Sequence, residues 1–93
     1  MPLTKKVSFD TVLEKGHRLQ IPKLIVWQFK MQQNQALKVS VSPKRIWGVH
    51  KCFYAKMDKQ GRIHIPKLTI ALMANKENPN LEGYIFDVTL EPA

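Results

Sequence analysis

The sequence has 93 residues, 44 % hydrophobic and 24 % charged, so it is long enough for one small globular domain and too apolar for wholesale disorder. Lysine and arginine number 15 against 7 aspartate and glutamate, and the resulting net charge of +8 favours a polyanionic partner. The one cysteine, Cys52, excludes an intrachain disulfide and suits a reducing compartment. No apolar run is long enough for a membrane-spanning helix, so we expect a cytoplasmic protein with no membrane partner.

The first predicted element is a β-hairpin. Residues 7–14 alternate between apolar and polar side chains, which is the period of a strand. Lys15-Gly16-His17 interrupts this pattern, and Gly16 can supply the positive φ of a tight turn. Residues 18–21 alternate again, and Pro22 ends this second strand because proline cannot donate to a ladder.

A helix and a third strand are predicted next. Pro22 suits the first turn of a helix, and residues 23–33 are apolar over much of the helical circumference, which predicts a largely buried helix. The β-branched pair Ile25-Val26 leaves a strand as the alternative. Residues 37–41 return to period two, and a turn follows at 42–44.

Residues 45–58 read as one long extended segment that joins the two halves of the chain, with a bend between Gly48 and Lys51. Both faces of this segment carry apolar groups, which predicts a strand covered on two sides and a buried, inert thiol at Cys52. Packing in the core is favoured for Trp47 and Tyr54, with stacking of these aromatic residues on nucleobases as the alternative.

The second half repeats the order of the first. It contains a predicted turn at 58–61, a strand at 62–65, a helix over about 67–76, a polar loop at 75–80 and a strand over about 84–90.

An internal repeat supports this division. KGHRLQIPKL at 15–24 and KQGRIHIPKL at 59–68 lie 44 positions apart and share six identical residues. VSVSP at 39–43 resembles VTLEP at 88–92, now 49 positions apart, which places an insertion in the second copy near 75–80. We therefore expect a single domain, 1–93, that is mostly β with two short helices. It would consist of two strand–strand–helix–strand repeats, about 5–48 and 49–93, which a pseudo-twofold axis relates within one β-barrel.

The second copy of the repeat resembles a known family. Residues 57–68, MDKQGRIHIPKL, are similar to the start of the AbrB/SpoVT/MazE-type swapped-hairpin DNA-binding domain, and the matching positions are Asp58, Gly61, Arg62, Ile63, Ile65 and Pro66. The first copy is degenerate, with Glu14 in place of the aspartate and His17 in the glycine slot. Two copies in one chain resemble the tandem arrangement of MraZ-type proteins or a fused AbrB dimer. The double-psi or cradle-loop barrel, built from the same repeat, remains the competing topology.

The resemblance implies a DNA-binding transcription regulator whose outward basic hairpin residues meet duplex DNA, with Arg62 and Arg18 as the leading contacts. Arginines that the family often has after the Ile-Pro are replaced here by Val26-Trp27 and Ile70-Ala71. Strand alternation independently places a set of polar side chains outward on the hairpins, where a two-stranded ribbon could enter the major groove. The candidate DNA-binding residues are Arg18, Arg62, Lys15, Lys59, Gln20, His64 and Lys56.

Catalysis is not expected. The three histidines have no metal-ligand spacing, and no nucleophile triad or phosphate loop is visible, so we expect no enzyme activity, cofactor, metal or small-molecule substrate. Alternative functions are an antitoxin, or a small-barrel protein-interaction module that uses the acidic stretch 77–91. The sequence leaves self-association into a dimer open.

Overall fold

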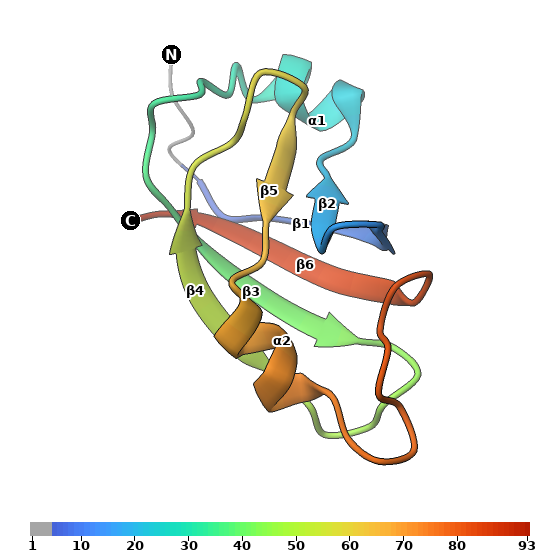
Figure 1. The fold of residues 1–93 in the computed structure, drawn as a ribbon. Helices are drawn as coiled ribbons and strands as arrows, with labels where there is room; N and C mark the ends of the chain where they lie inside the picture. Colours follow the sequence, from blue (N-terminus) through green and yellow to red (C-terminus); the bar gives the residue numbers. More distant parts are fainter. Residues whose placement is uncertain (1–4) are drawn as a thin grey trace.

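A computed structural model describes residues 5–93, and its secondary structure is mostly β with two short helices (Figure 1). The strands form one antiparallel sheet with the order β4-β3-β6-β1-β2-β5, which curls into a half-barrel. The elements are β1 (Val7–Glu14), β2 (Arg18–Gln20), α1 (Lys23–Gln28), β3 (Leu37–Pro43), β4 (Lys51–Ala55), β5 (Arg62–His64), α2 (Lys67–Met73) and β6 (Ile85–Pro92).

The core lies on the inner side of the curled sheet. Strand alternation sends every second side chain inward, and β3 shows this most clearly because its burial alternates along its whole length. The inward residues are aliphatic apart from two phenylalanines and three methionines. The fully enclosed side chains include Leu13, Leu19, Ile21, Leu37, Val39, Ile63, Ile65, Phe86, Val88 and Leu90.

The strand pairing shows the same register twice. Phe9 of β1 lies opposite Val88 of β6, and Phe53 of β4 lies opposite Val39 of β3. The two pairs are equivalent in the repeat, because Phe9 and Phe53 lie 44 positions apart and Val39 and Val88 lie 49 positions apart, which are the two offsets seen in the sequence. The first strand of each half therefore pairs with the last strand of the other half, and β3 pairs with β6 at the centre.

Helix α1 is shorter and more exposed than the sequence predicts. It ends at Gln28, because Lys30 adopts a left-handed conformation with φ 50°. The Met31 amide then donates to the Val26 carbonyl at 3.0 Å, and the Lys30 amide donates to the Trp27 carbonyl. This Schellman motif turns Met31 into the core and leaves no residue of α1 buried, so the prediction of a largely buried helix over 23–33 is wrong.

The segment 45–58 is not one extended strand. Residues 44–48 form a turn in which Gly48 has φ 80°, and β4 begins only at Lys51. Only the inner face of β4 is covered, so Cys52 is an exposed thiol and Tyr54 is exposed beside it. Trp47 is 98 % exposed. The predictions of two-sided burial, a buried thiol and core packing for Trp47 and Tyr54 are therefore wrong.

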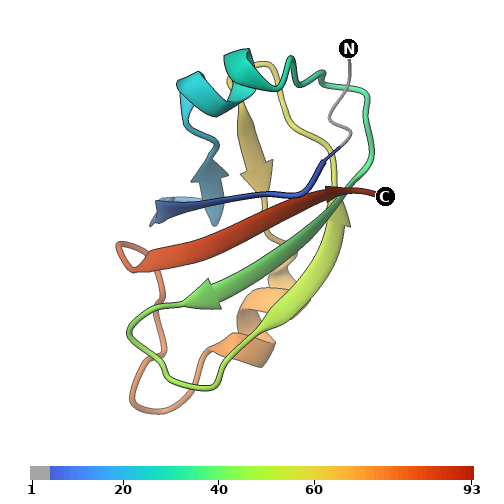
Figure 2. The same cartoon turned by 180° about the vertical axis from the view of Figure 1, so that it is seen from behind.

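Other boundaries shift by a few residues. β3 continues to Pro43 and the turn follows it, because Pro43 still lies opposite Phe86 of β6. α2 ends at Met73, where the side chain reaches the core and Ala74 becomes extended. The last strand runs to Pro92 because Leu37 pairs with that residue. Figures 1 and 2 show α1, β2 and the start of β5 at one end of the molecule, and α2 with the 44–50 loop at the other.

Candidate nucleic-acid interface

Strands β2 and β5 lie side by side and antiparallel, and we call this pair the ribbon (residues 18–20 and 62–64). Arg18 lies opposite His64, and Gln20 lies opposite Arg62. Between these pairs, Leu19 and Ile63 face each other and are fully buried. Since alternate residues point to opposite faces, the four polar side chains lie on the outer surface above that apolar pair, as the sequence predicts.

Matching hydrogen bonds fix both ends of the ribbon. The Ile21 amide donates to the Gly61 carbonyl and the Ile65 amide donates to the His17 carbonyl, each at 2.9 Å. Gly61 has φ 76° and His17 has φ 59°, so the histidine occupies the left-handed position that glycine takes in the other turn. The two Ile-Pro segments therefore leave the ribbon through equivalent contacts.

The turn before β5 is organised by Asp58. Its Oδ1 accepts hydrogen bonds from the backbone amides of Gln60 and Arg62 at 2.8 and 2.9 Å. The Arg62 amide, foremost among the causes, holds the pKa of the Asp58 carboxyl below its usual value, with the Gln60 amide helping. The carboxylate thus stabilises the turn through these two hydrogen bonds.

The other turn uses its acidic residue differently. Glu14 accepts a 2.7 Å hydrogen bond from Arg62 Nε and forms an ion pair with it. Arg62 also donates from Nη1 to Gln60 Oε1, and its side chain is only 28 % exposed. Arg62, the leading candidate from the sequence, is therefore a half-buried residue held by internal partners on two sides.

Two further ribbon side chains are also engaged within the protein. Gln20 Nε2 donates to the backbone carbonyls of Ile21, Gln60 and Gly61 at 3.0 to 3.2 Å. His64 Nε2 lies 2.8 Å from the Gly16 carbonyl. In this conformation both groups stabilise the ribbon, and contact with a base would require them to exchange partners.

Arg18 differs from the other three. Its side chain is exposed, and within residues 5–93 its guanidinium has no hydrogen-bond or ion-pair partner. Lys15, Lys59 and Lys56 are likewise exposed near the two turns and have no such partner in that range. These four side chains can donate hydrogen bonds to phosphates without breaking a hydrogen bond or an ion pair within the protein.

Acidic groups near the ribbon lower its local charge. Besides Glu14 and Asp58, Glu82 accepts a 2.8 Å hydrogen bond from the Gly16 amide. The contact of Glu82 with this turn could not be predicted from the sequence, because Glu82 lies 66 positions from Gly16 and only the folded chain brings them together.

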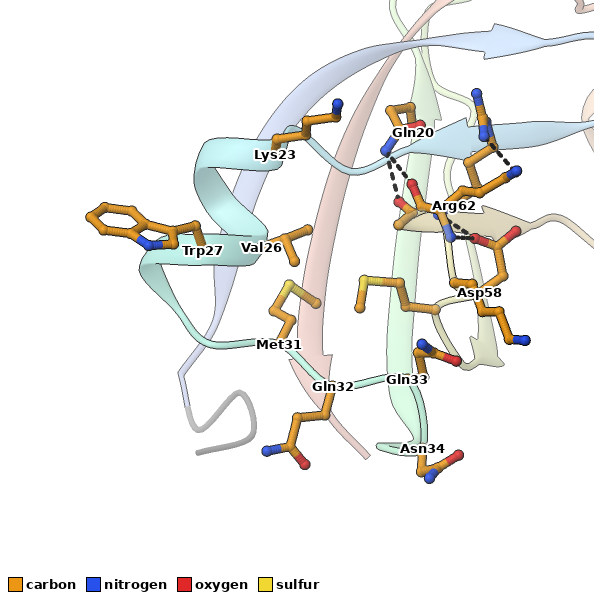
Figure 3. Close-up of a pocket in the computed structure, with 14 residues that line it drawn as sticks. Gln20, Lys23, Val26, Trp27, Met31, Gln32, Gln33, Asn34, Asp58 and Arg62 are labelled. Carbon is orange, nitrogen blue, oxygen red and sulfur yellow. Dashed lines mark hydrogen bonds between the residues drawn. The ribbon is translucent and has the colours of Figure 1, made fainter.

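An open groove of about 1040 Å³ lies beside the ribbon, between α1 with the loop that follows it and the turn before β5 (Figure 3). Val26 and Met31 point into it, and Gln20 and Arg62 lie at its ribbon side. Trp27 projects outward from α1 at the rim and is 76 % exposed. The full lining is Gln20, Lys23, Val26, Trp27, Met31, Gln32, Gln33, Asn34, Met57, Asp58, Lys59, Gln60, Gly61 and Arg62.

Comparison with known proteins bears on the fold. No protein-family model matches the chain, and no curated protein matches its sequence. The chain is similar to the solution structure of PHS018 from Pyrococcus horikoshii, with a TM-score of 0.71 and 22 % identity over 99 % of this chain and 94 % of that one. A likeness at this identity concerns the architecture alone. Within residues 5–93, no helix is long and apolar enough to cross a membrane.

Proposed function

We propose that this protein binds duplex DNA through the ribbon and acts as a transcription regulator of the AbrB-like kind, without enzymatic activity. The observation that carries the proposal is the placement of Arg18, Gln20, Arg62 and His64 on one outer face, directly above the buried Leu19–Ile63 pair. A two-stranded antiparallel ribbon fits the major groove, where arginine and glutamine are the side chains that read guanine and adenine.

The proposal includes the architecture. In it, two repeats, about 5–48 and 49–93, form one swapped-hairpin barrel of the AbrB-like or cradle-loop kind. The recurring register of Phe9 with Val88 and Phe53 with Val39 supports this, and so do the two equivalent Ile-Pro contacts. The pseudo-twofold axis would pass between Leu19 and Ile63, so that the turns before β2 and β5 both contribute to one surface.

Charge supports the same ligand. The net charge of +8 gathers polyanions, and Arg18 with the lysines at the turns would position the phosphates. Within this proposal Arg18 is the main cationic contact and Arg62 a positioning residue for the turn before β5, because the ion pair with Glu14 already compensates the charge of Arg62.

A gel-shift titration tests the function. Affinity for duplex DNA should fall steeply with salt, with a log–log slope near −0.9 for each phosphate neutralised. The double variant Arg18→Ala/Arg62→Ala should abolish the specific shift, and Arg18→Ala alone should flatten the slope by about one phosphate. Lys76→Ala, which removes one cation from the loop after α2, is the matched control and should bind like the parent. If the double variant binds duplex DNA as the parent does, the ribbon is not the interface.

A protein-interaction module is the second candidate, and exposed apolar side chains favour it. Leu24 on α1 and Leu68 and Leu72 on α2 are all more than half exposed. Binding of a protein partner over these helices would be an alternative function to DNA binding. In that case Leu68→Ser/Leu72→Ser would abolish binding of the partner and leave the affinity for DNA unchanged.

A further inference from the structure

The loop between β3 and β4 carries an exposed tryptophan, Trp47, that does not pack against the core. Trp47 is 98 % exposed at the tip of residues 44–50, whereas the other apolar residues of the loop, Ile46 and Val49, pack against the core. Covering this ring with a ligand would remove a large apolar area from water, and tryptophan is enriched at binding interfaces because it combines such a ring with a polar N–H.

The base of the loop is held firmly. The Lys44 amide donates to the Ile85 carbonyl at 2.9 Å, and Ser42 Oγ donates to the Val49 carbonyl at 2.7 Å. The Arg45 guanidinium lies 5.1 Å from the centroid of the Tyr84 ring. The indole is therefore presented from an anchored turn, which lowers the entropy lost when a ligand binds.

The loop that carries the indole is rich in cationic residues. Residues 44–51 contain Lys44, Arg45, His50 and Lys51 and no acidic residue. Lys44 forms a 2.7 Å ion pair with Asp10, whose hydrogen bond raises the pKa of the lysine, so it stays charged. Arg45 and Lys51 form no ion pair within residues 5–93. An aromatic platform flanked by cations is how proteins bind the bases and phosphates of unpaired nucleic acid.

We propose that Trp47 and the basic loop around it form a second nucleic-acid contact, in which the indole stacks on an unpaired base and Arg45 and Lys51 hold the adjoining phosphates. The proposal rests on the proposed function in taking nucleic acid as the ligand, and it adds a preference for single-stranded or locally unpaired segments. The loop and α2 lie at one end of the molecule, while β2 and α1 lie at the other, so this contact is separate from the ribbon (Figures 1 and 2).

An anionic membrane fits the loop less well. Interfacial binding scales with the apolar area that enters the lipid, and here one side chain projects while Ile46 and Val49 remain packed against the core. Stacking on a base needs only the one ring.

Fluorescence anisotropy with two labelled probes tests the proposal: an oligothymidylate of about 20 nucleotides and a duplex of mixed sequence and equal length. The variants are Trp47→Ala, Trp47→Phe, which keeps an aromatic ring, and Tyr54→Ala, which removes an exposed aromatic side chain from the outer face of β4. Because Trp47 and Tyr54 are exposed, all three variants should keep the circular-dichroism spectrum of the parent. Vesicles containing phosphatidylserine are the third probe.

Trp47→Ala should bind the oligothymidylate about five-fold to a hundred-fold more weakly than the parent, with duplex affinity nearly unchanged. Trp47→Phe should retain most of the single-strand affinity, and Tyr54→Ala all of it. Equal oligothymidylate binding by Trp47→Ala and the parent overturns the proposal and leaves duplex binding by the ribbon untouched. Single-strand binding that depends on Trp47 without any duplex binding supports this proposal and contradicts the ribbon function. If the parent does not bind the oligothymidylate but binds the vesicles, and Trp47→Ala loses vesicle binding, the nucleic-acid proposal is overturned and the loop is a membrane contact.

Discussion

Arg62 Nε donates a 2.7 Å hydrogen bond to Glu14 Oε1, joining β5 to the end of β1 across 48 positions of sequence. The pair sits at the edge of the ribbon, with the arginine 28 % exposed and the glutamate 40 % exposed. Arg62, the first residue of β5, is thus tied to Glu14, the last residue of β1. Under the proposed function, the affinity of the ribbon for DNA should therefore depend on Glu14 as well as on the cations.

Glu14→Gln should tighten binding to duplex DNA. The substitution removes a negative charge from the ribbon and frees Arg62 from its ion pair, so the affinity should rise by about three-fold at low salt and by less at high salt. Glu77→Gln removes the same charge from the exposed loop after α2 and is the control. Anisotropy titrations at two salt concentrations measure both effects, and a weaker complex for Glu14→Gln would show that the ion pair holds Arg62 in its binding position.

Lys30→Gly should stabilise the protein by about 1 kcal/mol, because the left-handed conformation at this position is strained for a side chain with a Cβ. The Schellman hydrogen bonds of Lys30 and Met31 involve only backbone atoms and survive the change. Asn34→Gly, in the same exposed loop but without a positive φ, should be neutral or destabilising. Urea unfolding measures the stability of both variants. A loss of stability in Lys30→Gly would contradict the left-handed conformation at the end of α1.

This helix end marks where sequence reasoning failed. Glycine is the usual residue in that position, and a lysine gives no sign of a left-handed conformation, so the apolar pattern was extended through residue 33. Core packing is predicted for Trp47 and Tyr54 because large aromatic residues dominate many small cores, and burial of the 23–33 helix is predicted from its apolar circumference. Here alternating aliphatic side chains of the strands fill the space, and the indoles remain outside.

Other features could be predicted because they depend on local periodicity. Alternation alone placed Arg18 and His64 on the outer face and Leu19 and Ile63 on the inner face, and the structure agrees. The shared Ile-Pro sequence also predicts that each of these strands ends at its proline, and β2 and β5 both end before Pro22 and Pro66. The pairing of Arg62 with Glu14 could not be predicted in this way, since it depends on how the strands meet in space.

Asp58→Asn should lower stability by about 1 kcal/mol at neutral pH, because two backbone amides lose a charged acceptor. The folded-state pKa of Asp58 lies below its ordinary value of 3.8, so the folded chain binds fewer protons than the unfolded chain in acid. The stability contributed by Asp58 is therefore complete above about pH 5 and is lost as the pH falls through the folded-state pKa.

Thermal unfolding from pH 7 down to pH 3 measures this effect. The difference between the parent and Asp58→Asn should shrink as the pH falls below about 4. Glu77→Gln, in the exposed loop after α2, is the control and should follow the parent throughout. A constant difference between the parent and Asp58→Asn at all pH values would show that the carboxylate charge is not what stabilises the turn.

Gly61→Ala should destabilise the protein by about 2 kcal/mol, more than Gly48→Ala does. Both glycines have a positive φ, so both substitutions introduce backbone strain. At Gly61 the new methyl group would also lie 3.1 Å from Gln20 Nε2 and push this amide away from its hydrogen-bond acceptors, whereas at Gly48 nothing lies within 4 Å. Equal losses for the two variants would mean that the Gln20 amide does not brace the ribbon.

The ribbon as the DNA contact is tested most directly by a nuclear magnetic resonance titration of the labelled protein with a short duplex. The account predicts that the backbone amides of residues 15–20 and 59–64 shift first and furthest, and that raising the salt concentration reverses the shifts. Shifts confined to α2 and the outer face of β6, with the ribbon amides unmoved at saturation, would contradict it.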